Sequence, residues 1–346
     1  MKLTVQTADG VHQIQASADQ QILRAALCQG IHLPYDCATG TCGTCRVRLL
    51  AGQASDGWPE APGARRCGAG DILSCQGVAL TDCTLSVSRL RPPAPGTGRP
   101  EALTGVLRRR RLLAPDVMRF DVSLARPFEF AAGQFVLLET AEIPGARAYS
   151  IAGARRGGMD VWFLARRKVG GRFTRWLFDR GAGIEGARLE LFGPLGRATF
   201  HPAARTPILC VAGGTGLAGM LAILGRAGES GHFDEGTARL LFGVRTNRDL
   251  FLLDQLSALR ANRPDRLKID VALSDEEPHP DLAARYPALS FHAGLVDAVL
   301  ARTAQPPPAG TRAYLAGPRA MVDAALRVLV QHGRLPPQDV RYDRFD

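Results

Sequence analysis

Four cysteines near the amino terminus have a spacing that can hold an iron–sulfur cluster. Cys37, Cys42 and Cys45 follow the pattern C-x4-C-x2-C, and Cys75 comes after a gap of 29 residues. This spacing is typical of plant-type [2Fe–2S] clusters, which take three thiolates from one loop and a fourth from elsewhere. Glycines between the cysteines leave room for backbone N–H groups to approach the inorganic sulfides. We therefore predict a [2Fe–2S] cluster on these four thiolates.

Two other kinds of site could use these cysteines, and both are less favoured. A structural zinc site normally takes two C-x2-C pairs, and Cys75 has no close partner in the sequence. A disulfide framework requires an oxidising compartment. The opening residues, MKLTVQTADGVHQIQA, lack the basic and apolar regions of a secretion signal, and no apolar run approaches membrane-spanning length. We expect a cytoplasmic protein with reduced thiols.

A glycine-rich turn in the last third of the chain could bind a dinucleotide. Gly214, Gly216 and Gly219 form a G-x-G-x-x-G pattern after an apolar run that ends at Val211. Between a strand and a helix, such glycines let backbone N–H groups approach a pyrophosphate. A tight turn without a ligand is the alternative.

The end of the next predicted strand affects the choice between NADH and NADPH. The chain reads GVRTNRD there, with Arg245 where an acidic residue is usual. An arginine favours the 2′-phosphate of NADPH, and an acidic residue favours the ribose of NADH. Asp249 follows four residues later, so the sequence leaves the preference open.

Two motifs in the middle third could hold a flavin. Their residues are Arg147, Tyr149 and Ser150 in the first, and Gly170, Gly171 and Thr174 in the second. The first offers a charge for a phosphate, a ring for stacking and a hydroxyl for a hydrogen bond. The second places glycines before a helix start, where anions bind; a simple helix cap at the threonine is the alternative.

The elements that position these residues fall into three segments. Residues 91–100, RPPAPGTGRP, are rich in proline and read as a linker. The linker and a second boundary near residue 204 divide the chain into three segments, each with its own pattern of apolar and polar residues: 1–90, 101–204 and 205–346. We predict one domain in each of these three segments.

The first segment reads as a sheet with one packed helix. Strands at 2–7 and 11–16 flank a turn at Asp9-Gly10. A helix is predicted to open at Ser17 and Asp19 and to stop at Gly30. Two further strands are expected near 45–50 and 84–90.

The second segment reads as a small antiparallel barrel and the third as a doubly wound parallel sheet. The barrel strands are predicted at VMRFDVSL, GQFVLLET, RAYSIAG, MDVWFLAR and ARLELFG, with one helix near 173–179. The parallel strands are predicted at PILCVAG, ARLLFGV, LKIDVAL, TRAYLAG and QDVRYD, with helices near 217–227, 249–261, 294–303 and 319–332.

The charge of the chain is unevenly distributed. The formal net charge is +10, yet residues 1–90 hold seven basic and seven acidic residues. The only basic run, Arg108 to Arg111, has no interleaved aromatic residues, which argues against a nucleic-acid surface. A solvated strand edge is the simplest interpretation of this run, and steering of phosphorylated cofactors is the functional one.

The order and spacing of all these motifs resemble the ferredoxin–NADP reductase superfamily. The chain is most similar to its oxygenase-reductase branch with an amino-terminal plant-type ferredoxin, as in benzoate, anthranilate and terephthalate dioxygenase reductases. The resemblance covers essentially the whole chain. It implies a multidomain fold: a β-grasp-like α+β ferredoxin, an antiparallel β-barrel flavin domain and a doubly wound α/β nucleotide-binding domain.

The resemblance also implies a role for each motif residue. Arg147 would contact the flavin phosphate, while Tyr149 would stack on the isoalloxazine and Ser150 would lie near its N5 atom, which makes these last two the catalytic residues. The pyrophosphate of FAD would be held by Gly170, Gly171 and Thr174. The nicotinamide dinucleotide would be bound by Gly213, Gly214, Thr215, Gly216, Arg245, Gly317 and Pro318.

Two positions near the carboxyl terminus bear on the flavin site. The family motif C-G-P-x-x-M reads AGPRAM here, so Ala316 replaces the cysteine near the nicotinamide, and we expect slower but working flavin reduction. Phe345 falls where the family often places an aromatic ring against the flavin. Tyr342 is the alternative, and both could simply pack the last strand.

The function implied is an NAD(P)H-dependent reductase. Electrons would pass from NADH or NADPH to FAD, to the [2Fe–2S] cluster and on to the terminal oxygenase of an aromatic ring-hydroxylating dioxygenase, directly or through an intermediate ferredoxin. A reductase for a diiron monooxygenase or for a deoxysugar dehydrase is the alternative within this architecture. An electron carrier or redox sensor without reductase activity is the alternative from another class.

Overall fold

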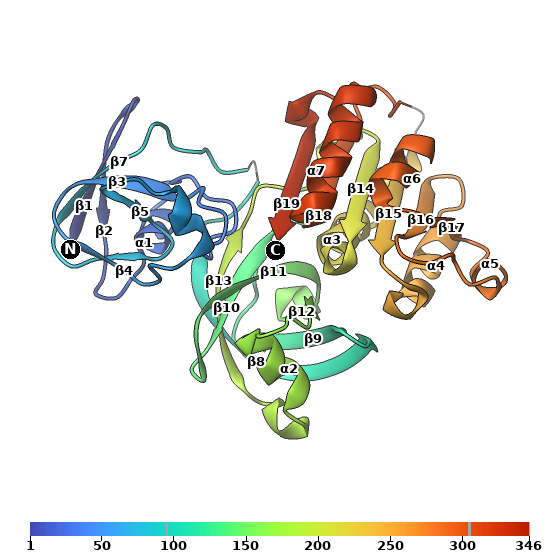
Figure 1. The fold of residues 1–346 in the computed structure, drawn as a ribbon, viewed down its shortest axis with the longest axis horizontal. Helices are drawn as coiled ribbons and strands as arrows, with labels where there is room; N and C mark the ends of the chain where they lie inside the picture. The colour runs from blue at the N-terminus through green and yellow to red at the C-terminus, as the bar shows by residue number, and fades with distance from the viewer. Residues whose placement is uncertain (95, 304–305, 346) are drawn as a thin grey trace.

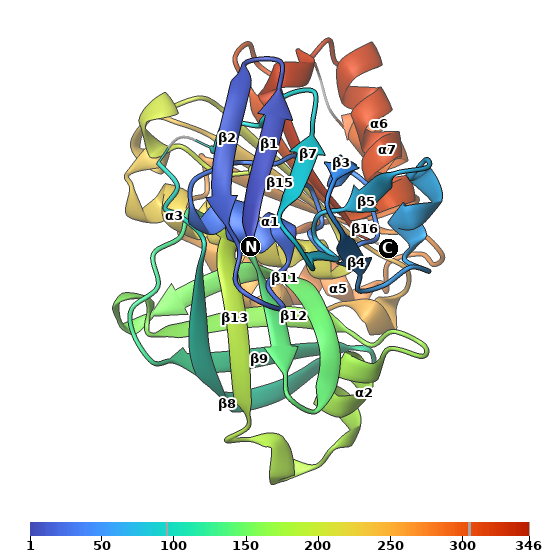
Figure 2. The same cartoon turned by 90° about the vertical axis from the view of Figure 1, so that its left-hand side faces the viewer.

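The computed structural model describes residues 1–94, 96–303 and 306–345, which fold into three units (Figure 1). An amino-terminal sheet lies to the left in that view, a parallel sheet lies to the upper right, and a barrel lies below and between them. Figure 2 shows the first unit in front of the third, with both above the barrel. The predicted fold class is confirmed in each of the three units.

The first unit is a five-stranded sheet with one helix and a small second sheet. Its elements are β1 (Lys2–Thr7), β2 (Gly10–Gln15), α1 (Ile22–Cys28), β3 (Arg46–Ala51), β4 (Ala54–Asp56), β5 (Asp71–Leu73), β6 (Gly77–Ala79) and β7 (Cys83–Ser86). The order is β2-β1-β7-β3-β5, with β1 parallel to β7. Leu3 and Val5 alternate along β1 and share a core with Ile22 and Leu27 of α1, because alternate strand residues face one side.

The helix α1 begins later than the sequence predicts. Ser17 and Asp19 do not open it, because the backbone N–H of Ser17 donates to Gln20 Oε1 at 3.1 Å and closes a turn. Asp19 has a φ of 61°, outside the helical range. The helix starts at Ile22 instead, after Gln21, and no side chain caps it.

The second unit is a closed antiparallel barrel. Its elements are β8 (Glu101–Ala114), β9 (Val117–Leu124), β10 (Phe135–Thr140), β11 (Ile143–Arg155), β12 (Asp160–Arg166), α2 (Arg172–Asp179) and β13 (Arg188–Leu195). The order around the barrel is β10-β11-β12-β9-β8-β13. Phe120 and Phe163 are fully buried and stack with their ring centroids 5.1 Å apart, which fills the interior.

The basic run lies on β8, and one of its members has a structural use. Arg110 donates to the carbonyl oxygens of Leu177, Arg180 and Gly181 at 2.7, 2.8 and 2.6 Å. These carbonyls lie in the last turn of α2 and just after it, where unpaired C=O groups and the helix dipole favour a cation. Arg110 therefore fixes α2 to the barrel wall.

The third unit is a six-stranded parallel sheet covered by helices. Its elements are β14 (Ile208–Gly213), α3 (Leu217–Glu229), β15 (Ala238–Val244), α4 (Leu253–Ala261), β16 (Leu267–Leu273), α5 (Asp281–Arg285), β17 (Ser290–Ala293), α6 (Val296–Thr303), β18 (Arg312–Pro318), α7 (Arg319–Arg327) and β19 (Val340–Phe345). The strand order is β17-β16-β15-β14-β18-β19. From β14 the chain adds strands outward on one side as far as β17, and it then returns to add β18 and β19 on the other side of β14. Ligands of such sheets bind at this reversal, beyond the carboxyl ends of the strands.

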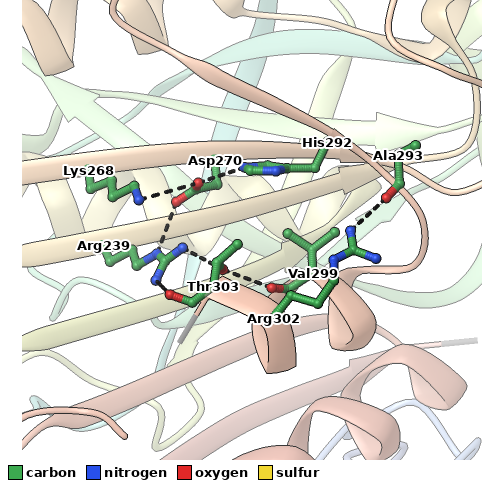
Figure 3. Close-up of polar contacts among 8 residues, drawn as sticks. All are labelled: Arg239, Lys268, Asp270, His292, Ala293, Val299, Arg302 and Thr303. Carbon is green, nitrogen blue, oxygen red and sulfur yellow. Dashed lines mark hydrogen bonds and ion pairs between the residues drawn. The ribbon is translucent and has the colours of Figure 1, made fainter. Parts of the chain in front are cut away.

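A buried charge network joins four elements of this sheet (Figure 3). The side chain of Asp270 on β16 is fully buried, and it accepts hydrogen bonds from Arg239 at 2.9 Å and from His292 at 2.8 Å. Arg239 also donates to the carbonyl oxygen of Thr303 at 2.7 Å. The network therefore ties β15, β16 and β17 to the end of α6.

The barrel packs against both of its neighbours. Phe135, Phe192 and Leu195 of the barrel belong to the core of the first unit. Arg24 of α1 reinforces this contact, since it pairs with Glu139 and lies 5.1 Å above the ring of Phe192. On the other side α3 packs against β11 within a second shared core. The described residues contain no helix with the length and apolarity needed to cross a membrane.

Candidate functional site

The four predicted cluster cysteines are brought together as two pairs. Cys45 donates a thiol hydrogen bond to Cys75, with the sulfurs 3.1 Å apart. The side chains of Cys37 and Cys42 form a second hydrogen-bonded pair. No three His, Cys, Asp or Glu side chains converge on a single-ion site within the described ranges. Two pairs of thiols match the needs of a two-iron cluster, in which each iron takes two protein ligands.

The loop that carries three of these cysteines is shaped to present backbone N–H groups to sulfur. Thr39 N and Cys42 N both donate to Cys37 Sγ at 3.4 Å, and Thr44 N donates to Cys42 Sγ at 3.4 Å. Such N–H donors stabilise thiolate charge. The hydrogen bond from Cys42, with those from the loop, lowers the pKa of Cys37 to about 4.

Gly43 and Arg66 hold this loop from outside, and Arg66 was not expected from the sequence. Arg66 donates from Nη1 to the carbonyl oxygen of Cys42 at 2.6 Å. Gly43 has a φ of +74°, and a Cβ there would lie 2.9 Å from Cδ of Arg66. The arginine therefore packs on the loop between two cluster ligands, a position that no spacing rule reveals.

The predicted flavin residue Tyr149 lies at the edge of the aromatic core of the barrel. Its ring contacts Phe120 edge-on at 5.4 Å and Phe173 at 5.5 Å between centroids. Burial raises the pKa of its hydroxyl well above the usual value, so the ring stays neutral. Ser150, the next residue of β11, pairs in register with Phe135 of β10. An immobilised aromatic ring beside a hydroxyl fits the isoalloxazine of a flavin.

Arg147 lies two residues before Tyr149 but is folded onto its own strand. Its guanidinium donates to the carbonyl oxygens of Pro144, at 2.8 Å, and of Gly145. Burial lowers its pKa, and the nearby charge of Arg172 adds to this effect. Two arginines therefore lie near each other, Arg147 on β11 and Arg172 at the start of α2, and the contact of Arg147 with the flavin phosphate stays a prediction.

The second flavin motif forms the turn before α2, and Thr174 is not the helix cap. The helix begins at Arg172 after Gly171, and Thr174 lies within its first turn. The Thr174 hydroxyl accepts from Lys168 N at 3.2 Å and donates to the carbonyl oxygen of Gly171 at 3.2 Å. Gly170 has a φ of +71° with open space around it. The helix start therefore leaves backbone N–H groups available for a phosphate.

The two glycine motifs of the third unit meet at the point where the strand order reverses. Gly213 ends β14, and a Cβ there would lie 2.6 Å from Sδ of Met321 and 3.0 Å from Cδ of Pro318. A Cβ on Gly216 would overlap the carbonyl oxygen of Ala316. Only glycine fits at Gly216, where the clash is with backbone, and a side chain at Gly213 would require Met321 to move. The predicted residues Gly214 and Thr215 form the turn between them, and Gly317 on β18 lies against Gly213, since a Cβ on Gly317 would lie 3.0 Å from Gly213 N.

The strand β15 ends at the predicted selectivity residue. Arg245 is exposed, and its guanidinium lies 3.7 Å from Asp249 and 4.0 Å from Asp116 of the barrel. Glu276 accepts from Asn247 N and Nδ2, both at 2.9 Å, on the other side of the same loop. Arg245 is thus surrounded by carboxylates.

Of the two carboxyl-terminal aromatic candidates, Phe345 is partly buried and Tyr342 is exposed. Phe345 pairs in register with Pro318 at the carboxyl end of β18. Its side chain packs against the hydrophobic core that the barrel shares with the third unit. Tyr342 stacks under Arg344, whose guanidinium carbon lies 4.4 Å from the ring centroid. Phe345 therefore packs inside the protein, and its contact with the flavin stays a prediction.

Two residues just before the cluster loop, Tyr35 and Asp36, lie close to the other two units. Tyr35 accepts a hydrogen bond at its hydroxyl from Gly196 N of the barrel at 3.3 Å. Asp36 pairs with Arg91 at 2.8 Å. Burial, with the charge of Asp36, raises the pKa of Asp343 on β19 to about 7. The segment before Cys37 therefore lies where all three units meet.

Comparison with known families matches two parts of the chain. Residues 6–80 match the 2Fe-2S iron-sulfur cluster binding domain, and residues 210–327 match the oxidoreductase NAD-binding domain. The first match contains all four predicted cluster cysteines, and the second contains the glycine-rich turn and the GPxxM motif.

Curated relatives are similar over nearly the whole chain. The ferredoxin–NAD(+) reductase component of the alkene monooxygenase system of Xanthobacter autotrophicus is 38% identical and covers 95% of this chain and 96% of its own length. The ferredoxin–NAD(P)(+) reductase component of the naphthalene 1,2-dioxygenase system of Pseudomonas putida is 32% identical, covering 100% and 98%.

A solved structure extends the similarity to the complete fold. The ferredoxin reductase in carbazole 1,9a-dioxygenase is 30% identical with a TM-score of 0.83, and the match covers 100% of this chain and 99% of that one. All three units of the fold therefore have counterparts in a single known protein.

Proposed function

We propose a physiological role from one premise: the chain belongs to the family of ferredoxin–NAD(P)⁺ reductase components of multicomponent oxygenase systems. It is an oxidoreductase that carries electrons from NAD(P)H through FAD to a [2Fe–2S] cluster. FAD supplies the chemistry that connects a two-electron hydride donor to a one-electron cluster. The pairing of Cys37 with Cys42 and of Cys45 with Cys75 is the observation that carries the cluster assignment.

The protein's own residues bind and position the three cofactors. We propose that Tyr149 and Ser150 form the flavin face, with the start of α2 on the pyrophosphate. The glycine-rich turn after β14 is proposed to hold the dinucleotide against the same site. Tyr35 holds the segment before Cys37 against the barrel, and Asp36 ties it to Arg91 of the segment that leads into the barrel, so we propose that packing sets the distance between flavin and cluster.

The electron acceptor is proposed to be the terminal oxygenase of a ring-hydroxylating dioxygenase or an intermediate ferredoxin that serves it. The naphthalene and carbazole dioxygenase relatives support this role. A monooxygenase is the second candidate, supported by the 38% identical alkene monooxygenase relative.

Anaerobic optical titration tests the electron path. Purified protein should show overlapping flavin and iron–sulfur absorption, and NADH or NADPH should bleach both. Protein that holds cluster iron but binds no flavin would contradict the reductase function. Transfer to purified dioxygenase and monooxygenase components, measured as turnover, then distinguishes the two acceptors.

The charges around Arg245 favour NADH over NADPH. A 2′-phosphate would meet the carboxylates of Asp249 and Glu276 and the exposed Asp275, whereas ribose hydroxyls can donate to carboxylates. Arg245, which could bind the phosphate, is already partly neutralised by two carboxylates. We expect kcat/KM for NADH to exceed that for NADPH by about tenfold or more, equivalent to 1.4 kcal/mol.

The variant Asp249→Asn sharpens this prediction. An asparagine oxygen can still accept from Thr246, as Asp249 Oδ2 does at 3.1 Å, but the charge that pairs with Arg245 is lost. NADPH efficiency should rise several-fold relative to NADH. Asp281→Asn, an equal charge change at an exposed site on α5, is the control and should leave the ratio unchanged.

Ala316→Cys is expected to speed flavin reduction. Ala316 is buried towards the carboxyl end of β18, and its carbonyl oxygen lies against Gly216 of the turn that is proposed to hold the dinucleotide. A larger side chain here would restrict the nicotinamide, and hydride transfer depends steeply on such positioning. Stopped-flow reduction at saturating NADH should become faster, and an unchanged rate would refute this role. Ala316→Ser is the control, because serine is close in size to cysteine but carries no sulfur. A faster reduction in both variants would mean that side-chain volume, and not sulfur chemistry, causes the effect.

A further inference from the structure

The last residue of β12 reaches from the barrel to the glycine-rich turn of the third unit. Arg166 Nε donates to Asp116 Oδ2 at 2.7 Å, and Asp116 lies in the turn between β8 and β9. A Cβ built on Gly214 would lie 3.6 Å from Nη1 of Arg166, the nearest heavy atom to it. A carboxylate of the barrel thus holds this guanidinium beside a turn of another unit.

The outer edge of the Arg166 guanidinium is available for an anion. Within residues 1–94, 96–303 and 306–345, its only hydrogen bond and ion pair run from Nε to Asp116. The side chain is 35% exposed. An arginine has five N–H donors in a planar fork, so one anchored nitrogen leaves the terminal pair free to bind phosphate oxygens.

The turn beside Arg166 has unpaired donors of its own. Gly214 has a φ of +53°, and the short helical turn Gly214–Gly216 runs into α3 without a side-chain cap. Leu217 N already donates to the carbonyl oxygen of Gly214, so the unpaired donors are those of the turn itself. The first N–H groups of this turn and the positive end of the dipole of α3 therefore lie beside the guanidinium. Two positively polarised groups from different units converge there.

We propose that Arg166 binds the pyrophosphate of the nicotinamide dinucleotide from the barrel side, opposite the N–H groups of the turn Gly214–Gly216. Asp116 is the positioning residue that orients the guanidinium. This inference rests on the function proposed above and deepens it, because the dinucleotide is then held by two units. The flavin pyrophosphate is the competing ligand, since Arg166 lies only a few residues before Gly170.

Equilibrium binding to the FAD-loaded protein tests this assignment. ADP-ribose contains the pyrophosphate and lacks nicotinamide, whereas adenosine lacks both. Calorimetry should show that Arg166→Gln weakens ADP-ribose binding by about 10- to 100-fold, as expected for a lost charge-assisted hydrogen bond, with adenosine binding unchanged. Arg166→Lys, which keeps the charge without the fork, should be intermediate. The KM for NADH should rise while the flavin reduction rate at saturating NADH stays close to that of the wild type.

Arg167→Gln is the matched control. Arg167 is adjacent and exposed, but its guanidinium pairs with Asp179 at 2.5 Å and packs on Phe178 on α2. It should bind ADP-ribose like the wild type. An unchanged affinity in Arg166→Gln would overturn the proposal, and so would a loss of FAD in Arg166→Gln that Arg167→Gln does not share. A wild-type protein that neither NADH nor NADPH reduces would instead overturn the proposed function.

Discussion

Cys75→Ser is expected to abolish electron delivery to a protein acceptor and to leave flavin reduction by NADH intact. The Cys75 sulfur lies 3.1 Å from that of Cys45, and both are buried. A serine hydroxyl ionises far less readily than a thiol, so it is a poor ligand for iron. Half of one iron's protein ligands would be lost, and the cluster should not assemble.

Two activities measured on the same sample separate this effect from unfolding. Reduction of ferricyanide at the flavin should persist, because the barrel and the third unit are untouched. Cytochrome c reduction through the cluster and oxygenase turnover should fall to background, and iron and sulfide analysis should show two atoms of each lost per chain. Retention of a [2Fe–2S] spectrum in Cys75→Ser would contradict the ligand assignment.

Cys67→Ser is the control for this experiment. Cys67 lies in the same unit, next to Arg66, and is half-buried, but it lies outside the spacing of the cluster ligands. Its replacement should change neither the iron content nor either activity. A loss equal to that of Cys75→Ser would mean that general damage to the unit, and not ligand loss, explains the result.

Asp270→Asn is expected to destabilise the third unit by about 3–5 kcal/mol, the range for breaking a buried ion pair. Asp270 is fully buried, and the guanidinium of Arg239 is only 19% exposed. Without the carboxylate, a charge in the sheet interior would remain uncompensated. The contacts of Arg239 with Thr303 would not replace it, because a carbonyl and a hydroxyl carry no net charge.

Hydrogen exchange locates this effect in a protein with several units, where a single melting temperature is not well defined. Peptides from β15, β16 and β17 should exchange faster in Asp270→Asn, while barrel peptides should not. Asp265→Asn, at an exposed position in the loop before β16, should behave like the wild type. Unchanged protection in β16 would show that the network contributes little.

A double variant separates charge pairing from packing. Replacing Arg239 with methionine and Asp270 with leucine removes both partners, and a buried pair replaced by apolar residues often loses little stability. Arg239→Met with Asp270→Leu should therefore be more stable than Asp270→Asn alone. A double variant that is less stable than Asp270→Asn would mean that the hydrogen bonds to Thr303 and His292 matter more than the charges.

Some elements escaped the sequence patterns for identifiable reasons. The strand β17 is only four residues long and reads SFHA, too short for its alternation to stand out. The start of α1 was misplaced because Ser17 uses its backbone N–H in a turn with Gln20. The long helices and buried strands of the third unit were found, since their apolar periodicity extends over many residues.

The sequence by itself determined the cluster, the order of the three units and the motif at each cofactor, because these depend on residue types at short, fixed spacing. Only the tertiary structure decided which distant residues meet. Cys45 pairs with Cys75, Gly213 packs on Met321, and Arg66 lies on the cluster loop. Such contacts depend on strand order and packing between units, and a linear sequence does not display them. The position of Arg166 beside Gly214 belongs to this second group, because it requires the barrel and the parallel sheet to pack together.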